Sequence, residues 1–319
     1  MKIVILDEYT INPGDLSWDV LKPFGKIIAY SRTTPEEVVQ RIGDSDIVLT
    51  SKVKIDEEVM KACPGIKYIG ILATGFDNID IPAAKKRNIA VTNIADYSTP
   101  DVSEFVFAMI LEHYNNIATH NESVLAGDWI KSKDFAYYPV PRTELRGKVL
   151  GIIGYGTIGQ RVAAISSVFG LKVLINSRST RNKPLFENCS FASKDDIFKK
   201  ADIISLHCPL TDETKDMVNE KKLKIMKHNA LLINTSRGAV VNEEALAKAL
   251  IKGEISHACI DVLSTEPMKA DCPLLKVPNI TITPHVAWAT YDSRKRIIEI
   301  SANNLKSFMK GDTLNRVEL

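Results

Sequence analysis

Paired cysteines, a charge bias and long apolar runs are all absent from this sequence. Its five cysteines are odd in number, lie far apart and form no C-x-x-C pair, so neither a disulfide framework nor a metal site is expected. Basic residues number 41 and acidic residues 39, so the net charge of +2 gives no general footprint for nucleic acid or an anionic membrane. No run reaches the ~18 apolar residues of a membrane span, and the first residues do not read as a secretion signal. We therefore expect a cytoplasmic protein.

The first 92 residues alternate short β-rich runs with helical stretches. At about 150 residues per domain, a chain of 319 residues predicts two domains, and 45% hydrophobic with 25% charged residues is an ordinary globular balance. The alternation predicts a parallel sheet with crossover helices. The expected strands are KIVIL (2–6), KIIAY (26–30), DIVLT (46–50), KYIGI (67–71) and IAVT (89–92).

A long helix is predicted from Ser98 to Gly127, because Ser98 opens a capping-box spacing and Gly127 is a suitable C-cap. Its apolar stripe is wider than a lone surface helix needs, which predicts a homodimer that uses this helix. The stripe comprises Val102, Phe105, Val106, Met109 and Ile110.

A second alternation follows and predicts a doubly wound sheet of six strands. The expected strands cover residues 148–154, 172–176, 202–207, 230–235, 256–261 and 279–284, and a last helix covers 288–310. The expected fold class is α/β, with two doubly wound parallel-sheet domains. A Rossmann-type dinucleotide-binding domain (99–287) is inserted in a discontinuous substrate domain (1–98 and 288–319).

The strongest local signal is a glycine-rich loop between a predicted strand and a predicted helix. It reads Gly154-Tyr155-Gly156-Thr157-Ile158-Gly159 and directly follows VLGII. In a G-x-G-x-x-G loop of this kind the first glycine makes a tight turn, the second admits the pyrophosphate and the third lets the helix approach the strand. These six residues therefore predict a dinucleotide site.

The end of the next strand bears on the choice of cofactor. An NAD site carries an acid about 20 residues beyond the glycines, where it binds the ribose. This chain instead reads Ser177-Arg178-Ser179-Thr180-Arg181. Because arginine binds a phosphate and a carboxylate would repel it, Ser177, Arg178 and Ser179 predict a preference for NADP over NAD. The alternative is that Arg178 is a solvated loop charge and both cofactors bind.

The motifs, in their order along the chain, resemble those of the D-isomer-specific 2-hydroxyacid dehydrogenase family from end to end. They are the glycine loop and the segments ATGFDN (73–78), NTSRG (234–238), DVLSTEP (261–267) and TPHVA (283–287). The segments LDEYTINPGDLSW, YSTPDVSEF and HVAWAT look most like the branch of glycerate dehydrogenase and hydroxypyruvate (glyoxylate) reductase.

Arg237, Glu266 and His285 are the catalytic residues that the resemblance implies. Each follows a predicted strand, at the edge where such sheets bind ligands. Arg237 would grip the substrate carboxylate and polarise the ketone. His285 would donate the proton, since an ordinary histidine titrates at about pH 6.5, and Glu266 would orient it and favour its charged form. Each role has an alternative. Arg237 could contact only the cofactor pyrophosphate, and Glu266 could be a solvated turn residue. His207, which also ends a predicted strand, competes with His285 as the proton donor.

The resemblance also assigns the binding residues. Thr74 and Gly75 would present backbone N–H groups to the substrate carboxylate. Lys52, just after a predicted strand, would face the same cleft unless it is solvated. Trp288 departs from the small residue that many relatives have near that place, and its indole would close the substrate pocket or pack at the domain junction. Asp261 would lie near the nicotinamide amide. Beyond the two loops already named, the expected cofactor contacts are Cys208, Pro209, Thr214, Thr235, Ser236, Arg237, Asp261 and His285.

The expected activity is an NAD(P)-dependent oxidoreductase that converts hydroxypyruvate or glyoxylate to D-glycerate or glycolate in a cleft between the domains. Two alternatives stay open. One is a D-lactate-type dehydrogenase, and the other is a non-catalytic, NAD(H)-sensing protein like the corepressors of this family, although the sequence shows no evident added interaction tail.

Overall fold

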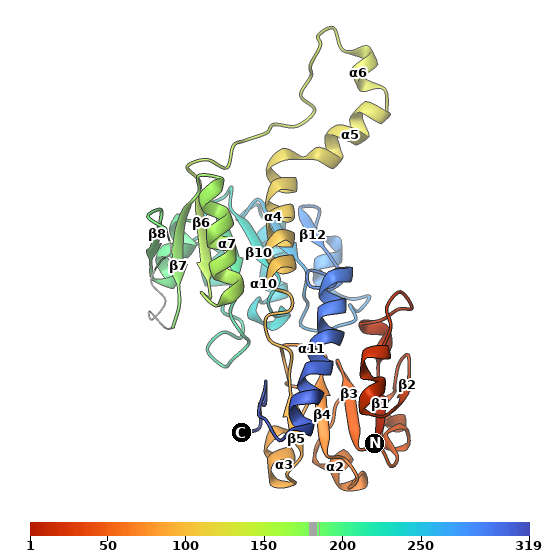
Figure 1. Cartoon of the computed structure of the whole chain (residues 1–319). Coiled ribbons are helices and arrows are strands. Elements are labelled where there is room, and N and C mark those ends of the chain that lie inside the picture. The colour runs from red at the N-terminus through yellow and green to blue at the C-terminus, as the bar shows by residue number, and fades with distance from the viewer. Residues whose placement is uncertain (179–183, 185) are drawn as a thin grey trace. The chain divides into compact units, whose positions relative to one another are not determined.

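The computed structural model describes residues 1–178, 184 and 186–319 (Figure 1). The chain divides into two compact units, Met1–Ser98 with Ala289–Leu319, and Thr99–Trp288. Trp288 thus falls in the second unit, one residue away from the boundary expected from the sequence. No helix in the described ranges is long and apolar enough to cross a membrane.

The first unit contains a five-stranded parallel sheet in the order β2-β1-β3-β4-β5. Apolar side chains of α1, α2 and α3 pack on one face, and Phe308 of α11 contacts Tyr68 of β4 at a ring distance of 4.9 Å. The strands are β1 (Lys2–Ile5), β2 (Lys26–Ala29), β3 (Ile47–Thr50), β4 (Tyr68–Ile71) and β5 (Ala90–Thr92). The helices are η1 (Glu8–Thr10), η2 (Asp19–Phe24), η3 (Pro35–Glu37), α1 (Val38–Ile42), α2 (Glu57–Ala62), α3 (Ile81–Lys86) and α11 (Tyr291–Met309).

The second unit contains a seven-stranded parallel sheet in the order β12-β11-β10-β9-β6-β7-β8. The strands are β6 (Val149–Ile153), β7 (Lys172–Asn176), β8 (Cys189–Phe191), β9 (Ile203–Leu206), β10 (Leu231–Asn234), β11 (His257–Ile260) and β12 (Ile280–Ile282). The helices are α4 (Thr99–Asn115), α5 (Ile117–Leu125), α6 (Asp128–Lys131), α7 (Thr157–Val168), α8 (Lys194–Lys200), α9 (Glu220–Leu223), η4 (Gly238–Val240), α10 (Glu243–Ile251) and η5 (Pro273–Lys276).

The α/β fold with two parallel sheets is confirmed, but the expected six strands of the second sheet are seven. The strand that the sequence did not reveal is β8, a three-residue strand at the edge of the sheet. Its exposed Ser190 and Phe191 give no apolar run that would mark a strand.

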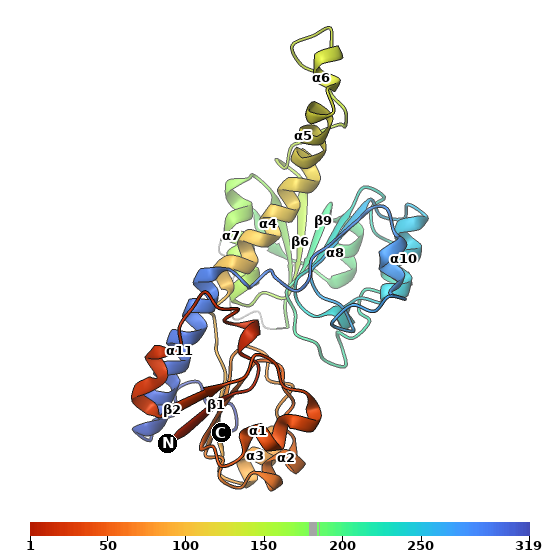
Figure 2. The same cartoon turned by 90° about the vertical axis from the view of Figure 1, so that its right-hand side faces the viewer.

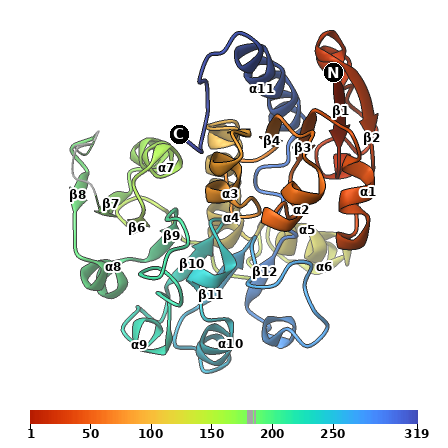
Figure 3. The same ribbon diagram turned by 90° about the horizontal axis from the view of Figure 1, so that it is seen from below.

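Helices cover both faces of the seven-stranded sheet, α4 and α7 on one and α8, α9 and α10 on the other (Figure 3). In β10, Leu231 and Ile233 pack under the first pair, whereas Leu232 packs under the other three. Because both faces are buried, the strands are nearly continuous apolar runs. The side chains that can contact a ligand therefore lie beyond the ends of the strands.

The predicted helix from Ser98 to Gly127 is wrong as a single helix. Asn116 adopts a left-handed conformation with φ of +51°, which separates α4 from α5. Part of the apolar stripe is buried within the unit itself, because Val106, Met109 and Ile110 pack in one core cluster with residues of α7 and β6. Figure 2 shows α5 and α6 projecting from the seven-stranded sheet as an arm (residues 117–140).

Candidate active site

The carboxyl ends of all seven strands meet at one edge of the second sheet, because the strands are parallel. Most of the predicted functional residues of this unit follow those ends. Gly154 follows β6, Arg178 β7, Cys208 β9, Arg237 β10, Glu266 β11 and His285 β12.

The glycine loop has the shape of a pyrophosphate cradle. Gly154 has φ of +103°, and an added Cβ would lie 2.4 Å from the His207 carbonyl oxygen. At Gly159 a Cβ would lie 2.2 Å from the Gly154 carbonyl oxygen. At Gly156, the N-cap of α7, a Cβ would meet no described atom within 4 Å. The loop therefore packs tightly at Gly154 and Gly159 and leaves space at Gly156, in front of the N-terminus of α7. This space fits the pyrophosphate of a dinucleotide.

His285 and Glu266 form a directed pair. His285 Nδ1 lies 2.7 Å from Glu266 Oε2, and Glu266 Oε1 accepts a hydrogen bond of 3.0 Å from the Leu263 N–H. A carboxylate only accepts, so the imidazole carries a proton on Nδ1. His285 Nε2 has no hydrogen-bond partner among the described residues, and the two side chains are 26% and 34% exposed. Nε2 is therefore the ring nitrogen that could bind a ligand.

The buried carboxylate of Asp261 holds the loop that carries His285. Asp261 Oδ1 accepts from Thr283 Oγ1 at 2.6 Å and from the Val286 N–H at 2.9 Å, and Oδ2 accepts from the Ala287 N–H at 3.0 Å. The His285 N–H donates to the Asp261 carbonyl at 2.8 Å, and His285 has φ of +56°. This unusual backbone conformation is maintained by the surrounding bonds. The sequence indicated only a cofactor contact for Asp261, and its positioning role was missed.

Arg237 follows a rigid turn. The Asn234 side chain accepts from the Ser236 N–H at 3.0 Å and donates to the Arg237 carbonyl at 2.9 Å, while Arg237 Nη1 donates to the Ser236 carbonyl at 2.8 Å. Thr235 Oγ1 is buried and has no hydrogen-bond partner in the described part of the chain. An unpartnered buried hydroxyl is costly, so a ligand group that pairs with Thr235 would stabilise this edge.

Gly238 and Glu243 bring the loop of Glu266 against the turn of Arg237. A Cβ on Gly238 would lie 1.9 Å from the Leu263 carbonyl carbon, and the Ser264 N–H donates to Glu243 Oε1 at 2.6 Å. Sequence reasoning did not single out either residue in this role. The signal that could have identified them is the glycine directly after Arg237.

His207 lies at the same edge but differs from His285. Its Nε2 lies 2.9 Å from Ser205 Oγ, and desolvation lowers the pKa of His207 to about 4. It is therefore uncharged near neutrality and is a poorer proton donor than a histidine paired with a carboxylate. Burial raises the pKa of the neighbouring Cys208 thiol, and Thr214 Oγ1 donates to the Pro209 carbonyl at 2.7 Å, which shapes the loop after β9.

Other predicted cofactor residues contribute in different ways. The Tyr155 side chain is buried, and its ring centroid lies 6.3 Å from that of Phe191. Ile158 packs partly into the same core. Arg178 is exposed at the end of β7, and Ser177 beside it is half-buried. Ser179, Thr180 and Arg181 lie outside the described residues.

In the first unit, Lys52 and Thr74 follow β3 and β4 at the carboxyl edge of the sheet and are exposed. The buried Asp7 carboxylate accepts from the Ser51 N–H at 2.9 Å and from the Lys52 N–H at 2.7 Å. Thr74 Oγ1 donates to the Ile94 carbonyl at 2.8 Å, which fixes the turn before Gly75. These bonds make both loops rigid.

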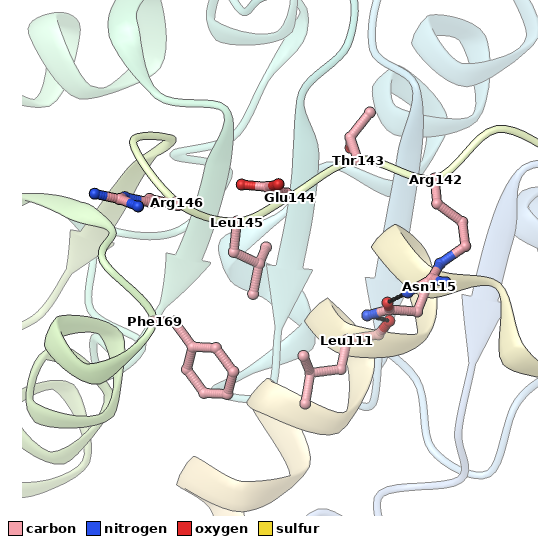
Figure 4. A pocket seen from close by; sticks show the side chains of 8 residues that line it. All are labelled: Leu111, Asn115, Arg142, Thr143, Glu144, Leu145, Arg146 and Phe169. Carbon is pink, nitrogen blue, oxygen red and sulfur yellow. Dashed lines mark hydrogen bonds between the residues drawn. The ribbon is translucent and has the colours of Figure 1, made fainter.

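A hollow of about 560 Å³ lies elsewhere in the second unit (Figure 4). Leu145 and Arg146 precede β6 and Phe169 precedes β7, so the hollow lies at the amino edge of the sheet, opposite the glycine loop. Its other lining residues are Leu111, Asn115, Arg142, Thr143 and Glu144. Because none of the predicted catalytic residues lines it, the hollow is not part of the candidate active site.

The second unit of the chain is similar to a known protein family. The model of the D-isomer specific 2-hydroxyacid dehydrogenase NAD binding domain matches residues 107–287. The chain belongs to this family. The resemblance seen in the motifs is thereby confirmed, and membership makes the protein a dehydrogenase of 2-hydroxy acids that uses a nicotinamide dinucleotide.

Relatives match the chain over nearly its full length. A hydroxypyruvate reductase of Blautia hydrogenotrophica is 43% identical over 320 residues, and 99% of each chain is covered. A glycerate dehydrogenase of Methylorubrum extorquens is 38% identical, again with 99% of each chain covered. The structure of an acyclic imino acid reductase in complex with NADPH and D-Arg is 31% identical, with a TM-score of 0.87 over 99% of this chain and 100% of the other.

Proposed function

We propose that this dehydrogenase reduces hydroxypyruvate or glyoxylate to D-glycerate or glycolate, with NADPH as the preferred hydride donor. The observation that carries the proposal is the His285–Glu266 pair, 2.7 Å apart, at the same sheet edge as the glycine loop. The names of the two full-length relatives support the choice of substrate.

Different residues of the chain bind the substrate, donate the proton and orient the proton donor. The Arg237 guanidinium binds the substrate carboxylate and polarises the ketone oxygen. His285 Nε2 donates a proton to that oxygen, while Glu266 keeps the ring oriented through Nδ1. Lys52 and the backbone of Thr74 and Gly75 supply substrate contacts from the first unit. Trp288, half-buried beyond the His285 loop, closes the substrate pocket.

When bound, the nicotinamide cofactor supplies the hydride that reduces the ketone. The glycine loop holds its pyrophosphate at the N-terminus of α7. Thr235 and Ser236 contact it from β10, and Cys208, Pro209 and Thr214 line its site from β9. Asp261 binds near the nicotinamide amide in addition to holding the His285 loop. The missing acid after β7 and the exposed Arg178 support NADPH over NADH.

A panel of substrates tests this function. We expect the highest kcat/KM with hydroxypyruvate or glyoxylate and NADPH, with pyruvate slower. Pyruvate as the best substrate would instead favour a D-lactate-type enzyme. Tight cofactor binding with no turnover on any 2-oxo acid would favour the sensor of NAD(H).

Arg178→Ala should raise the KM for NADPH about ten- to a hundredfold and leave the KM for NADH nearly unchanged. The loss of a charge-assisted contact of about 1.5–3 kcal/mol gives this factor. Steady-state kinetics with both cofactors measures it, and Lys172→Ala, at the other end of β7, is the control. A wild type that prefers NADH, with neither KM changed in the variant, would show that Arg178 is an ordinary solvated residue.

The assembly that we propose is a homodimer formed through the arm, in place of the buried stripe of α4. The arm exposes large apolar side chains, which soluble monomers rarely gather in one place. They include Leu125 (78% exposed), Ile130 (89%), Phe135 (91%) and Tyr138 (82%).

Light scattering should therefore give twice the chain mass of 35.4 kDa at micromolar concentration. The double variant Ile130→Asp, Phe135→Asp should give the single mass, because charges replace apolar contacts. Val168→Asp, at an exposed apolar residue of α7, is the matched control and should stay dimeric. A wild type of single mass would contradict the dimer.

A further inference from the structure

Two cations leave the same edge of the second sheet from neighbouring strands. β7 and β8 are parallel, and Ile175 of β7 is the register partner of Phe191 of β8. Arg178 and Lys194 each lie three residues beyond this pair. Since neighbouring strands are about 4.8 Å apart, the chain leaves β7 and β8 at neighbouring points of this edge, and Lys194 follows as the first residue of α8.

The backbone before Lys194 is fixed to the end of β7. The Ala192 N–H donates to the Ile175 carbonyl at 2.8 Å, and Asn176 Nδ2 donates to the Ala192 carbonyl at 3.1 Å. This second bond ties the last residue of β7 to the residue two positions before Lys194. The Lys194 side chain therefore starts from a rigid position rather than from a loose loop.

Lys194 is also available for a ligand. The acids next to it are engaged with other lysines, Asp195 with Lys222 and Asp196 with Lys200. Neither Lys194 nor Arg178 has a hydrogen bond or ion pair among residues 1–178, 184 and 186–319. Lys194 is a half-buried residue without a described carboxylate partner, so it leaves an uncompensated positive charge at this edge.

The positive charges of Lys194 and Arg178 act on a residue beside the glycine loop, Cys208. Cys208 follows β9, on the other side of β6 from these strands. Burial raises the pKa of the Cys208 thiol, and the positive charges of Lys194 and Arg178 act in the opposite direction. Both side chains are thus near enough to influence one group beside the predicted cofactor site.

We infer that Lys194 is a second determinant of cofactor choice, which binds the ribose 2′-phosphate of NADP together with Arg178. The inference rests on the proposed NADPH preference. A phosphate monoester carries close to two negative charges at neutral pH, so two cations from adjacent strands neutralise it better than one. NADH lacks this group and gains nothing from Lys194.

Binding of two fragments to the full-length protein tests the inference without turnover. Adenosine 2′,5′-bisphosphate carries the 2′-phosphate, and 5′-AMP lacks it. We expect Lys194→Ala to weaken binding of the bisphosphate, measured by calorimetry, by roughly three- to thirtyfold relative to 5′-AMP, and raised salt to shrink the difference. Lys194→Arg should restore most of the affinity. Lys199→Ala, an exposed lysine of the same helix, is the matched control.

The outcomes separate this inference from the proposed function. If the wild type binds the bisphosphate more tightly than 5′-AMP and Lys194→Ala matches Lys199→Ala, Lys194 has no such role while the NADPH preference stands. If the wild type binds both fragments equally, the NADPH preference fails and the role of Lys194 fails with it. A selective loss in Lys194→Ala that Lys194→Arg repairs supports both.

Discussion

His285→Ala should lower kcat for hydroxypyruvate reduction about 10²–10⁴-fold and leave NADPH affinity nearly intact. The variant removes the only imidazole of the described residues that is paired with a carboxylate, Glu266, and with it the proposed proton donor. Steady-state kinetics gives kcat, and cofactor fluorescence gives the dissociation constant separately.

His228→Ala is the matched control for this prediction, because His228 is an exposed histidine whose Nδ1 lies 3.2 Å from the Gly253 carbonyl oxygen. Undiminished turnover of His285→Ala would reject its role as the acid. His207 would then be the next residue to test, although its pKa of about 4 leaves it uncharged near neutrality.

Arg237→Lys should raise the KM for the 2-oxo acid and lower kcat together, with kcat about 10²–10³-fold below wild type. An ammonium group keeps the charge but cannot reproduce the planar grip of a guanidinium on a carboxylate. Because Asn234 holds the backbone of the turn, the substitution leaves the position of residue 237 unchanged.

The comparison of Arg237→Lys with Arg237→Ala separates charge from geometry. We expect the lysine variant to retain part of the substrate affinity that the alanine variant loses. If Arg237 contacts only the cofactor pyrophosphate, both variants will instead raise the KM for NADPH and leave the KM for the oxo acid unchanged.

The sequence predicted the strands well where burial on both faces imposes apolar runs. The expected strand 172–176 agrees with β7 at both ends, and Ile203 to Leu206 of β9 lie inside the expected 202–207. β8 was missed because an edge strand of three residues needs no such run. The break at Asn116 was missed because a single left-handed residue leaves the apolar period on either side intact.

The sequence could name individual residues of the candidate site, but it could not predict the contacts between residues that lie on different loops. Glu266 and His285 could be named from motifs, but their separation of 2.7 Å depends on how two loops meet. The clamp of Asp261 on residues 283–287 involves backbone donors, which leave no trace in residue types. In the sequence Lys194 resembles any other helix lysine, and only the pairing of β7 with β8 shows that Lys194 and Arg178 follow neighbouring strand ends.

The most direct test of the account is transfer of the hydride itself. The protein is incubated with hydroxypyruvate and NADPH that carries deuterium at the transferable C4 position of the nicotinamide, and the product is analysed by mass spectrometry and chiral chromatography. We predict D-glycerate that carries deuterium at C2, formed by the wild type and about 10²–10⁴-fold more slowly by His285→Ala. Unlabelled or L-glycerate, or no product despite tight NADPH binding, would contradict the account.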